Sequence, residues 1–325
     1  MLKIKIKGSY ILVFALLVPT AGILIWMNAD KGSCVADYKW LNQALTCKDK
    51  PAISKAAYLT LRIKIEEQIA IWEKEDRVEK VAVFFRDLEN GPTLGINDRE
   101  KFVPASLLKV PVMFAYFKLA EENPAVLEKR LEYTTAYGGL FPQTITAKNS
   151  LESGNTYSVD DLIFRMIAYS DNGANLMLLE NLREISPERN LLTETFLELG
   201  MTTTQGNIDT EALSAKTYAS FFRLLYNVSY LSKEYSERSL QYLSQSDYKN
   251  GLRRGAPDNI AVANKFGERF LANDSVQLHD CGIIYYPHNP YLLCVMTKGA
   301  DFDELSDIIR TTSRMVWEEV DSRKL

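Results

Sequence analysis

The feature that most restricts the fold of this chain is the placement of its β-rich segments at two distant points of the sequence. Residues 81–87 and 93–97 are β-rich runs separated by the turn-forming sequence Glu-Asn-Gly-Pro. In the C-terminal part, a run at 262–266 precedes a hairpin at 279–297 with a Pro-His-Asn-Pro turn. One antiparallel sheet that takes strands from both ends of the chain accommodates all of these runs.

Helical patterns flank and separate the strands. An amphipathic helix is predicted over 54–76, before the first hairpin, and a closing helix over 303–320, after the last one. The apolar face of the first helix comprises Leu61, Ile65, Ile69 and Trp72. Between the hairpins the pattern predicts helices over 106–122, 158–183, 186–199 and 214–226, and a long connection over 130–157.

Composition agrees with a folded globular protein, since 46% of the residues are hydrophobic and 25% are charged. We therefore predict an α+β fold in which an antiparallel sheet built from both termini is flanked by helices and lies beside an all-helical lobe. The formal net charge is −4, and part of the positive charge lies in the first seven residues, so a nucleic-acid surface is not expected.

The N-terminus is predicted to anchor the chain in a membrane. Residues 9–27 carry no charged side chain, and at about 1.5 Å per helical residue they are long enough to cross a bilayer. The basic residues at 1–8 and the lack of a small-x-small cleavage motif favour an uncleaved anchor, with a cleaved signal peptide as the alternative. Residues 28–51 then form a juxtamembrane spacer, and 52–325 form an extracytoplasmic domain, which is secreted if the segment is cleaved.

The first motif with chemical potential is Ser106-x-x-Lys109 at the start of the apolar helix. A serine hydroxyl needs a neighbouring base to become a nucleophile, and a lysine desolvated by apolar neighbours has a lowered pKa and can be that base. Three residues apart on one helix face, the amine is expected to reach the hydroxyl. Taken alone, an N-cap serine followed by a surface lysine is the commoner explanation of this pattern.

Two further motifs follow in the chain. Ser170-Asp171-Asn172 ends an apolar helical run and, by itself, is an ordinary turn with a helix cap. Lys265 lies on the predicted strand at 262–266, and Gly267 lies just beyond its end. Taken alone, a lysine on such a strand usually has a structural role. The order of the three motifs matches the signature of the serine penicillin-recognising enzymes.

From about residue 54 to 320 the chain resembles the class A β-lactamase family of serine hydrolases. The resemblance implies that Ser106 is the acylated nucleophile and that Lys109 accepts its proton or takes part in the relay. It also implies that Ser170 passes a proton to the leaving nitrogen. For substrate binding it implies that Asn172 bonds the acyl amide, that the Lys265-x-Gly267 strand meets the substrate carboxylate, and that the backbone N–H groups of Ser106 and Glu268 form the oxyanion hole.

The chain departs from the family pattern at two points. No Glu-x-x-Leu-Asn element is found for activating the deacylating water, and the candidate carboxylates Asp209 and Glu211 lack the Leu-Asn context. Without such a base the acyl-enzyme is expected to be long-lived. The second departure is Phe266, where the family has a hydroxyl residue; either substrate selection differs, or Glu268, Arg269 or His279 compensates. For His279 a packed structural role is the favoured interpretation.

The four cysteines fall into two pairs. Cys281 and Cys294 are equidistant from the centre of the hairpin turn and therefore face each other across the strands, either as a disulfide or as two buried thiols. Cys34 and Cys47 either close a short loop or remain reduced. No metal site or organic cofactor is expected.

The leading hypothesis is a membrane-tethered serine acyl-enzyme hydrolase that acts on β-lactams or on D-Ala-D-Ala-like peptidoglycan stem peptides, with weak deacylation. The alternatives are a D,D-carboxypeptidase or penicillin-binding protein, a non-catalytic cell-wall binding module that retains the fold, and an esterase with another acyl substrate. The expected partners are the small-molecule or peptide substrate and the cytoplasmic membrane.

Overall fold

A computed structural model describes residues 38–42, 58–89, 91–134, 150–202, 210, 212–271, 274–287 and 289–323. The chain from Tyr38 to Leu325 forms one compact unit. The predicted anchor and the Cys34–Cys47 pair lie outside the described residues. Among the helices in the described ranges, none is both long and apolar enough to cross a membrane.

A five-stranded antiparallel sheet with the order β2-β1-β9-β8-β7 lies at the centre of this unit. Its strands are β1 (Lys80–Asp87), β2 (Thr93–Ile96), β7 (Val262–Phe270), β8 (Val276–Ile284) and β9 (Tyr291–Gly299). Strand β1 pairs with β9, so the two ends of the chain meet in the middle of the sheet. The predicted sheet built from both termini is confirmed.

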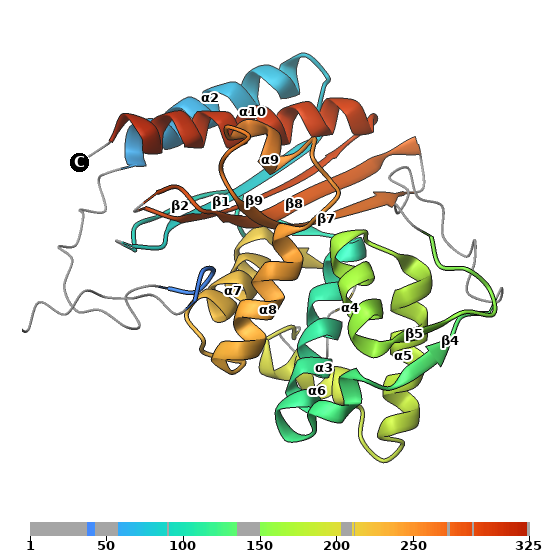
Figure 1. Ribbon diagram of the computed structural model, residues 1–325. Coiled ribbons are helices and arrows are strands. Elements are labelled where there is room, and N and C mark those ends of the chain that lie inside the picture. Colours follow the sequence, from blue (N-terminus) through green and yellow to red (C-terminus); the bar gives the residue numbers. More distant parts are fainter. Residues whose placement is uncertain are drawn as a thin grey trace, which may run out of the picture. The chain divides into compact units, whose positions relative to one another are not determined.

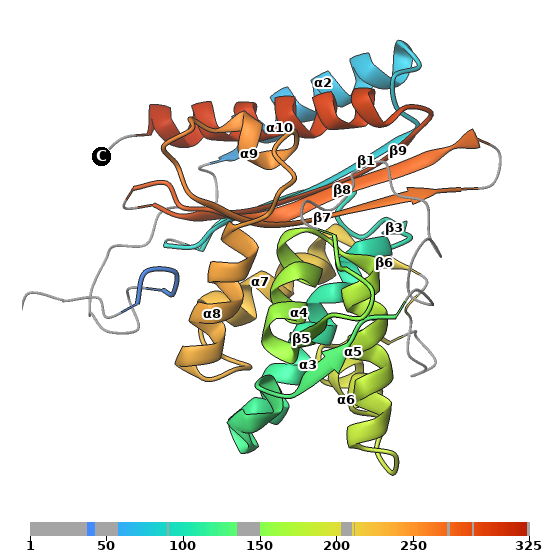
Figure 2. The same ribbon diagram turned by 45° about the vertical axis from the view of Figure 1, so that its right-hand side comes forward.

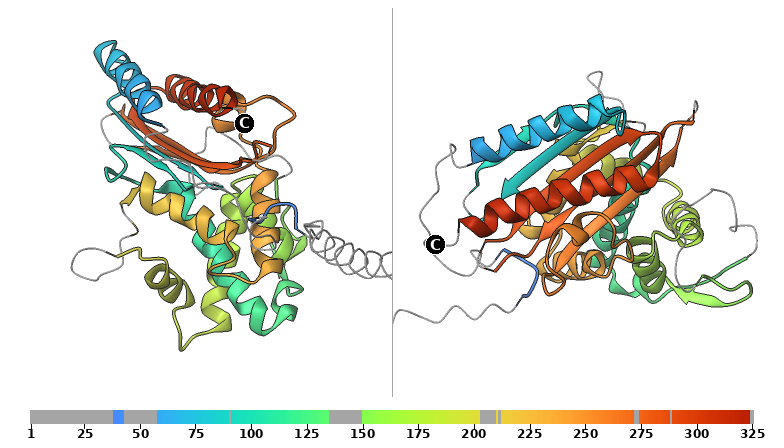
Figure 3. Two further views of the ribbon diagram at one scale, coloured as in Figure 1. Left: turned by 90° about the vertical axis from the view of Figure 1, so that its left-hand side faces the viewer. Right: turned by 90° about the horizontal axis from the view of Figure 1, so that it is seen from above.

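Two long helices, α2 (Leu59–Lys74) and α10 (Phe302–Ser322), cover one face of the sheet (Figure 1). Seen from above, they lie side by side over the strands (Figure 3). The predicted apolar face of α2 is the buried one. It belongs to a core with alternate residues of β1, such as Val81, Val83 and Phe85.

The opposite face of the sheet packs on a lobe of helices, which Figure 2 shows beneath the strands. Its elements are η3 (Ala105–Leu108), α3 (Lys109–Glu122), η4 (Pro124–Leu127), α4 (Val159–Ala168), α5 (Asn172–Ile185), α6 (Leu191–Glu198), α7 (Ala215–Tyr226) and α8 (Lys233–Ser244). Helix α3 is buried along most of its length and lies at the centre of the lobe, as its apolar sequence predicts. A short helix, α9 (Leu252–Gly255), leads to β7 and packs against α10.

The structure differs from the predicted elements at several points, and helix α8 was not predicted at all. The connection predicted over 130–157 begins and ends in paired strands, β4 (Arg130–Glu132) and β5 (Thr156–Ser158). A second small ladder joins β3 (Lys101–Phe102) to β6 (Leu213–Ser214). The helix expected over 186–199 starts later, because Asn190 caps α6 through a bond from the Thr193 N–H.

Residues 38–42, which we call the strap, lie within the predicted spacer and pack on the helical lobe. Trp40 and Leu41 are buried at 8% and 4% exposure. Two backbone N–H groups of the strap donate to the Glu237 carboxylate at 2.7 and 2.9 Å, and the Tyr285 hydroxyl donates to the Trp40 carbonyl. The strap is therefore attached to α8 and to the end of β8.

A disulfide joins Cys281 to Cys294 across β8 and β9. The two residues are direct register partners, as their equal spacing from the turn predicts. On the same rung of the sheet, Cys281 pairs with Lys265 of β7, and Cys294 pairs with Phe84 of β1. The cross-link therefore lies next to one of the predicted site residues.

Candidate active site

Ser106 lies in the 3₁₀ turn η3 and not in the α-helix that was expected to contain it. Helix α3 begins only at Lys109, so the turn presents the half-buried Ser106 at the wall of a cavity of about 670 Å³. Ala105, just before it, has a left-handed backbone with φ 49°. Such backbone strain at a non-glycine residue is typical of functional sites.

Lys109 is the buried amine of the site. Its side chain is 4% exposed, and Nζ donates to the Ser170 carbonyl at 2.6 Å and to Asn172 Oδ1 at 2.7 Å. Burial lowers the pKa of Lys109 to about 7, although the charges of Asp171 and Glu268 act in the opposite direction. Lys109 is therefore desolvated, as expected, but within the described residues its hydrogen bonds reach Ser170 and Asn172 rather than Ser106.

Ser170 connects the three sequence motifs. Its Oγ lies 3.1 Å from Lys109 Nζ and 3.0 Å from Lys265 Nζ, and the side chain is fully buried. Its backbone is also left-handed, with φ 55°. A neutral Lys109 can accept a proton as well as donate one, and Ser170 Oγ lies within its reach. This arrangement suits proton transfer between the serine and the lysine.

Asp171 and Asn172 hold the loop in place. The Asp171 carboxylate accepts a bond of 2.9 Å from the Ala174 N–H and caps α5, which agrees with the sequence prediction. Asn172 lines the cavity with its Oδ1 on Lys109. Within the described residues, Asn172 Nδ2 makes no hydrogen bond, which leaves it available to a substrate carbonyl.

On β7, alternate side chains point to opposite faces of the sheet. Lys265 points to the lobe, where its Nζ bonds Ser170 Oγ, whereas Phe266 packs on Tyr248 at 4.7 Å in the core under α10. Burial and the charge of Lys109 lower the pKa of Lys265. Gly267 follows on the lobe face, where a Cβ would lie 3.1 Å from Leu107. The phenyl ring therefore belongs to this core, but it also contacts the site, because Lys265 Nζ lies over it at 4.4 Å from its centre.

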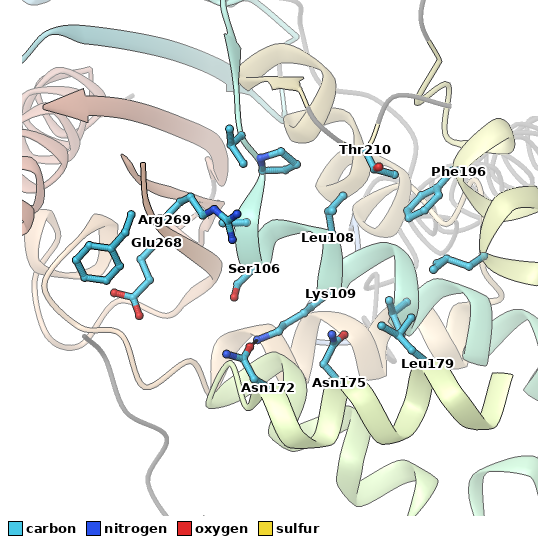
Figure 4. A pocket seen from close by; sticks show the side chains of 16 residues that line it. Ser106, Leu108, Lys109, Asn172, Asn175, Leu179, Phe196, Thr210, Glu268 and Arg269 are labelled. Carbon is cyan, nitrogen blue, oxygen red and sulfur yellow. Dashed lines mark hydrogen bonds between the residues drawn. The ribbon is translucent and has the colours of Figure 1, made fainter. Parts of the chain in front are cut away.

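Glu268, whose backbone N–H was predicted to belong to the oxyanion hole, lies on the edge strand β7. The carbonyls of Val262 and Phe266 accept bonds from Arg253 and Lys265 side chains, so even-numbered residues of β7 direct their backbone groups to the free edge of the sheet. The Glu268 N–H follows the same rule. Its side chain lines the Ser106 cavity, as does that of Arg269 (Figure 4).

The far wall of the cavity is apolar and was not predicted. It consists of Leu108, Val112, Leu179, Leu192 and Phe196. Asn175 also lines the cavity. The spacing of Asn172, Asn175 and Leu179 on α5 is i, i+3 and i+7, a helical face that the sequence could have indicated once Asn172 was suspected.

His279 does not take part in the site. His279 is fully buried, with Nε2 3.1 Å from the Val103 carbonyl and Nδ1 accepting from the Thr297 N–H, so the structural interpretation is confirmed. Burial lowers the pKa of His279 to about 4. Asp209 and Glu211 lie outside the described residues. In the described ranges, no group of three or more His, Cys, Asp or Glu side chains could hold a metal ion.

Comparison with known proteins agrees with this geometry. The sequence profile described as "Beta-lactamase enzyme family" matches residues 64–320. Among solved structures, PBP-A has a TM-score of 0.67 and 22% identity, with 81% of this chain and 97% of that chain covered. A mutant of PBP-A, solved as its acyl-enzyme complex with penicillin G, has a TM-score of 0.65 and 22% identity over the same shares of the two chains.

Other similar structures are β-lactamases. One from Chitinophaga pinensis has a TM-score of 0.68 and 18% identity, and 80% of this chain and 99% of that one are covered. A class A β-lactamase from Mycobacterium abscessus has a TM-score of 0.66 and 22% identity, with 79% and 99% covered. Among curated proteins, none matches the sequence significantly.

Proposed function

The chain belongs to the β-lactamase enzyme family and is a β-lactamase-like serine hydrolase, and from this we propose that it reacts with β-lactams or D-Ala-D-Ala-like peptides through an acyl-enzyme on Ser106. The observation that carries the proposal is the contact of Ser170 Oγ with both lysines, at 3.1 Å to Lys109 and 3.0 Å to Lys265. This contact unites the three motifs beside Ser106.

In the proposed acylation, Ser106 Oγ forms a bond to the carbonyl carbon of the substrate amide, and the carbon–nitrogen bond then breaks. The proton of Ser106 passes to the neutral Lys109, and Ser170 delivers its own proton to the departing nitrogen. The protonated Lys109, whose Nζ lies 3.1 Å from Ser170 Oγ, then returns a proton to Ser170. The backbone N–H groups of Ser106 and Glu268 stabilise the oxyanion. Asn172 Nδ2 donates to the carbonyl of the substrate's acyl amide. Hydrolysis of the ester by water then releases the acid and restores Ser106.

We expect deacylation to be slow. Among the described residues that line the cavity, the only carboxylate is that of Glu268, which lies on the β7 side. PBP-A, the fold relative solved in a mutant as a penicillin acyl-enzyme, is consistent with a stable adduct, although the likeness itself extends to the fold only. This favours penicillin-binding behaviour over rapid lactam hydrolysis.

The test is intact-mass spectrometry of the full-length protein incubated with a penicillin and sampled over time. We expect an adduct that forms on the wild type, is absent from Ser106→Ala and persists over hours. The matched control is Ser229→Ala, because Ser229 is an exposed loop serine. Labelling that survives Ser106→Ala would overturn the assignment, and an adduct that clears within minutes would contradict slow deacylation.

We also propose that the domain lies outside the cytoplasm, anchored by residues 9–27. The Cys281–Cys294 disulfide supports this, since stable disulfides are typical of oxidising compartments. The uncharged N-terminal stretch supports it independently. Protease treatment of intact cells tests the location: digestion of the domain from outside is expected, and protection would contradict it.

A further inference from the structure

Two buried amines meet at one hydroxyl in the site. Lys109 is 4% exposed and Lys265 is fully buried, and their Nζ atoms lie 3.1 and 3.0 Å from Ser170 Oγ. Two positive charges repel each other strongly where water is excluded, so one amine gives up its proton more readily than the other. The proposed acylation requires this amine to be Lys109, because it must accept the proton of Ser106.

Hydrogen bonds and burial alone do not keep Lys265 charged. Besides its contact with Ser170 Oγ, Lys109 Nζ donates to the Ser170 carbonyl and to Asn172 Oδ1, and Lys265 Nζ donates to the Phe266 carbonyl at 2.9 Å. Burial lowers the pKa of both lysines, and the charge of Lys109 lowers the pKa of Lys265 further. On these contacts alone, Lys265 would lose its proton first.

The surrounding carboxylates do not distinguish the two amines. Glu268 acts electrostatically on both of them, Asp171 acts on Lys109, and Asp280 of β8 acts on Lys265. Each amine therefore has one carboxylate of its own and shares another.

Other titratable groups near this part of the sheet add no negative charge beside the β7 lysine. His279 is uncharged near neutral pH, because burial lowers its pKa to about 4. Burial and the charge of Asp280 raise the pKa of Tyr218 and that of Tyr248, so both phenols stay neutral. Arg253 of α9 acts on Asp280 and offsets part of its charge.

The aromatic ring of Phe266 does distinguish the two amines. Lys265 Nζ lies over this ring at 4.4 Å from its centre, within the reach of about 6 Å for cation–π attraction. The ring is 1% exposed and packs on Tyr248 at 4.7 Å, so its position is fixed. The attraction is strongest in a desolvated site and favours the charged amine. Among the described residues, the hydrogen-bond partners of Lys109 Nζ are oxygen atoms only.

We propose that Phe266 is a positioning residue that keeps Lys265 charged and thereby makes Lys109 the base of the site. The proposal rests on the acylation of Ser106 proposed above. A charged Lys265 donates to Ser170 Oγ, so the hydrogen of Ser170 is directed to another acceptor and can pass to the leaving nitrogen. The residue that stands where a hydroxyl was expected thus contributes through its ring.

The experiment replaces Phe266 by pentafluorophenylalanine, which keeps a ring of similar size but reverses the charge distribution of its face, and by leucine, which removes the ring. Second-order acylation rates of the full-length protein with a fluorescent penicillin are measured from pH 5 to pH 10. We expect the midpoint of the profile to rise by about one pH unit in both variants, because Lys265 then loses its proton first and Lys109 keeps its own to higher pH. Acylation should fall about tenfold at pH 6 and less than about twofold at pH 9.

The matched control is pentafluorophenylalanine at Phe117, a buried ring that stacks on Tyr235 in the lobe. It should leave the midpoint unchanged. An unchanged midpoint with the fluorinated ring at Phe266 would overturn the proposal. A rate loss that is equal at all pH values would also overturn it, because this would indicate a structural role for the ring. Thermal unfolding of each variant verifies that it folds.

NMR of isotope-labelled lysine side chains tests the proposal without a substrate, with signals assigned from Lys109→Arg and Lys265→Arg. In the wild type Lys265 should stay charged to higher pH than Lys109, and the fluorinated ring at Phe266 should reverse this order. The same order in both proteins would overturn the proposal. If Ser106 of the wild type is not labelled at any pH, the proposed function itself fails, whereas the effect of Phe266 on Lys265 is still decided by NMR.

Discussion

Acylation of Ser106 should depend on pH in the way that the burial of Lys109 dictates. With a pKa of about 7, half of the Lys109 amines are neutral at pH 7, whereas an ordinary lysine near 10.4 would be neutral in roughly 0.04% of molecules. The neutral fraction is about 10% at pH 6 and about 90% at pH 8. The acylation rate should therefore rise about tenfold from pH 6 to pH 8 and then level off.

Removal of a nearby negative charge should move this profile in a known direction. Asp171 raises the pKa of Lys109, so Asp171→Asn should lower it and shift the midpoint of the profile to lower pH. Asparagine also caps helices, so the bond to the Ala174 N–H can be kept. Because Lys265 titrates beside Lys109, the observed midpoint belongs to the coupled pair.

The assay measures second-order acylation rates with a fluorescent penicillin from pH 5 to pH 10, for the wild type, Asp171→Asn and the exposed control Asp258→Asn. We expect a shift only in Asp171→Asn. A rate that continues to rise tenfold per pH unit up to pH 9 would mean that Lys109 has an ordinary pKa and would refute the reasoning. A flat profile would exclude Lys109 as the base.

Two further predictions concern stability. Replacement of both Cys281 and Cys294 by alanine should lower the free energy of unfolding by about 3 kcal/mol, because the disulfide joins residues that are 13 positions apart in the sequence. Urea denaturation measures this free energy. A change below about 0.5 kcal/mol would show that the cross-link adds little to stability. Trp40→Ala should lower the free energy of unfolding by about 3 kcal/mol, because a buried indole is lost, and should leave the acylation rate unchanged. Slower acylation at unchanged stability would instead connect the strap to the site.

The sheet could be predicted because its signals are local and symmetric. The equal distance of Cys281 and Cys294 from the turn sets their register, and the buried face of the helix over 54–76 follows from the spacing of its apolar residues.

Helix α8 was missed because its buried face contains serines. Ser236 and Ser239 are fully buried and satisfy their hydroxyls on the Leu231 and Tyr235 carbonyls, so the face does not look apolar in the sequence.

The candidate site was predicted residue by residue, but its internal geometry was not. The motif order indicated Ser106, Lys109 and Ser170, yet nothing local in the sequence reveals that Ser106 lies in a 3₁₀ turn or that Lys109 bonds Ser170. The substitution at Phe266 was noticed, but the face to which its ring points depends on the strand register. The apolar far wall is formed by η3, α3, α5 and α6 together, a tertiary arrangement that no single segment specifies.

The strap changes how far the enzyme could reach from a membrane. If residues 9–27 span the bilayer as proposed, only residues 28–37 lie between the anchor and the point where the strap is held against α8. Ten fully extended residues measure about 35 Å at most, whereas a free spacer up to residue 57 would allow roughly 100 Å. The docked strap therefore shortens the length of chain that can separate the domain from the membrane. It would restrict the accessible acyl donors to a thin layer next to the bilayer surface, and release of Trp40 would widen that layer without altering the chemistry of the site.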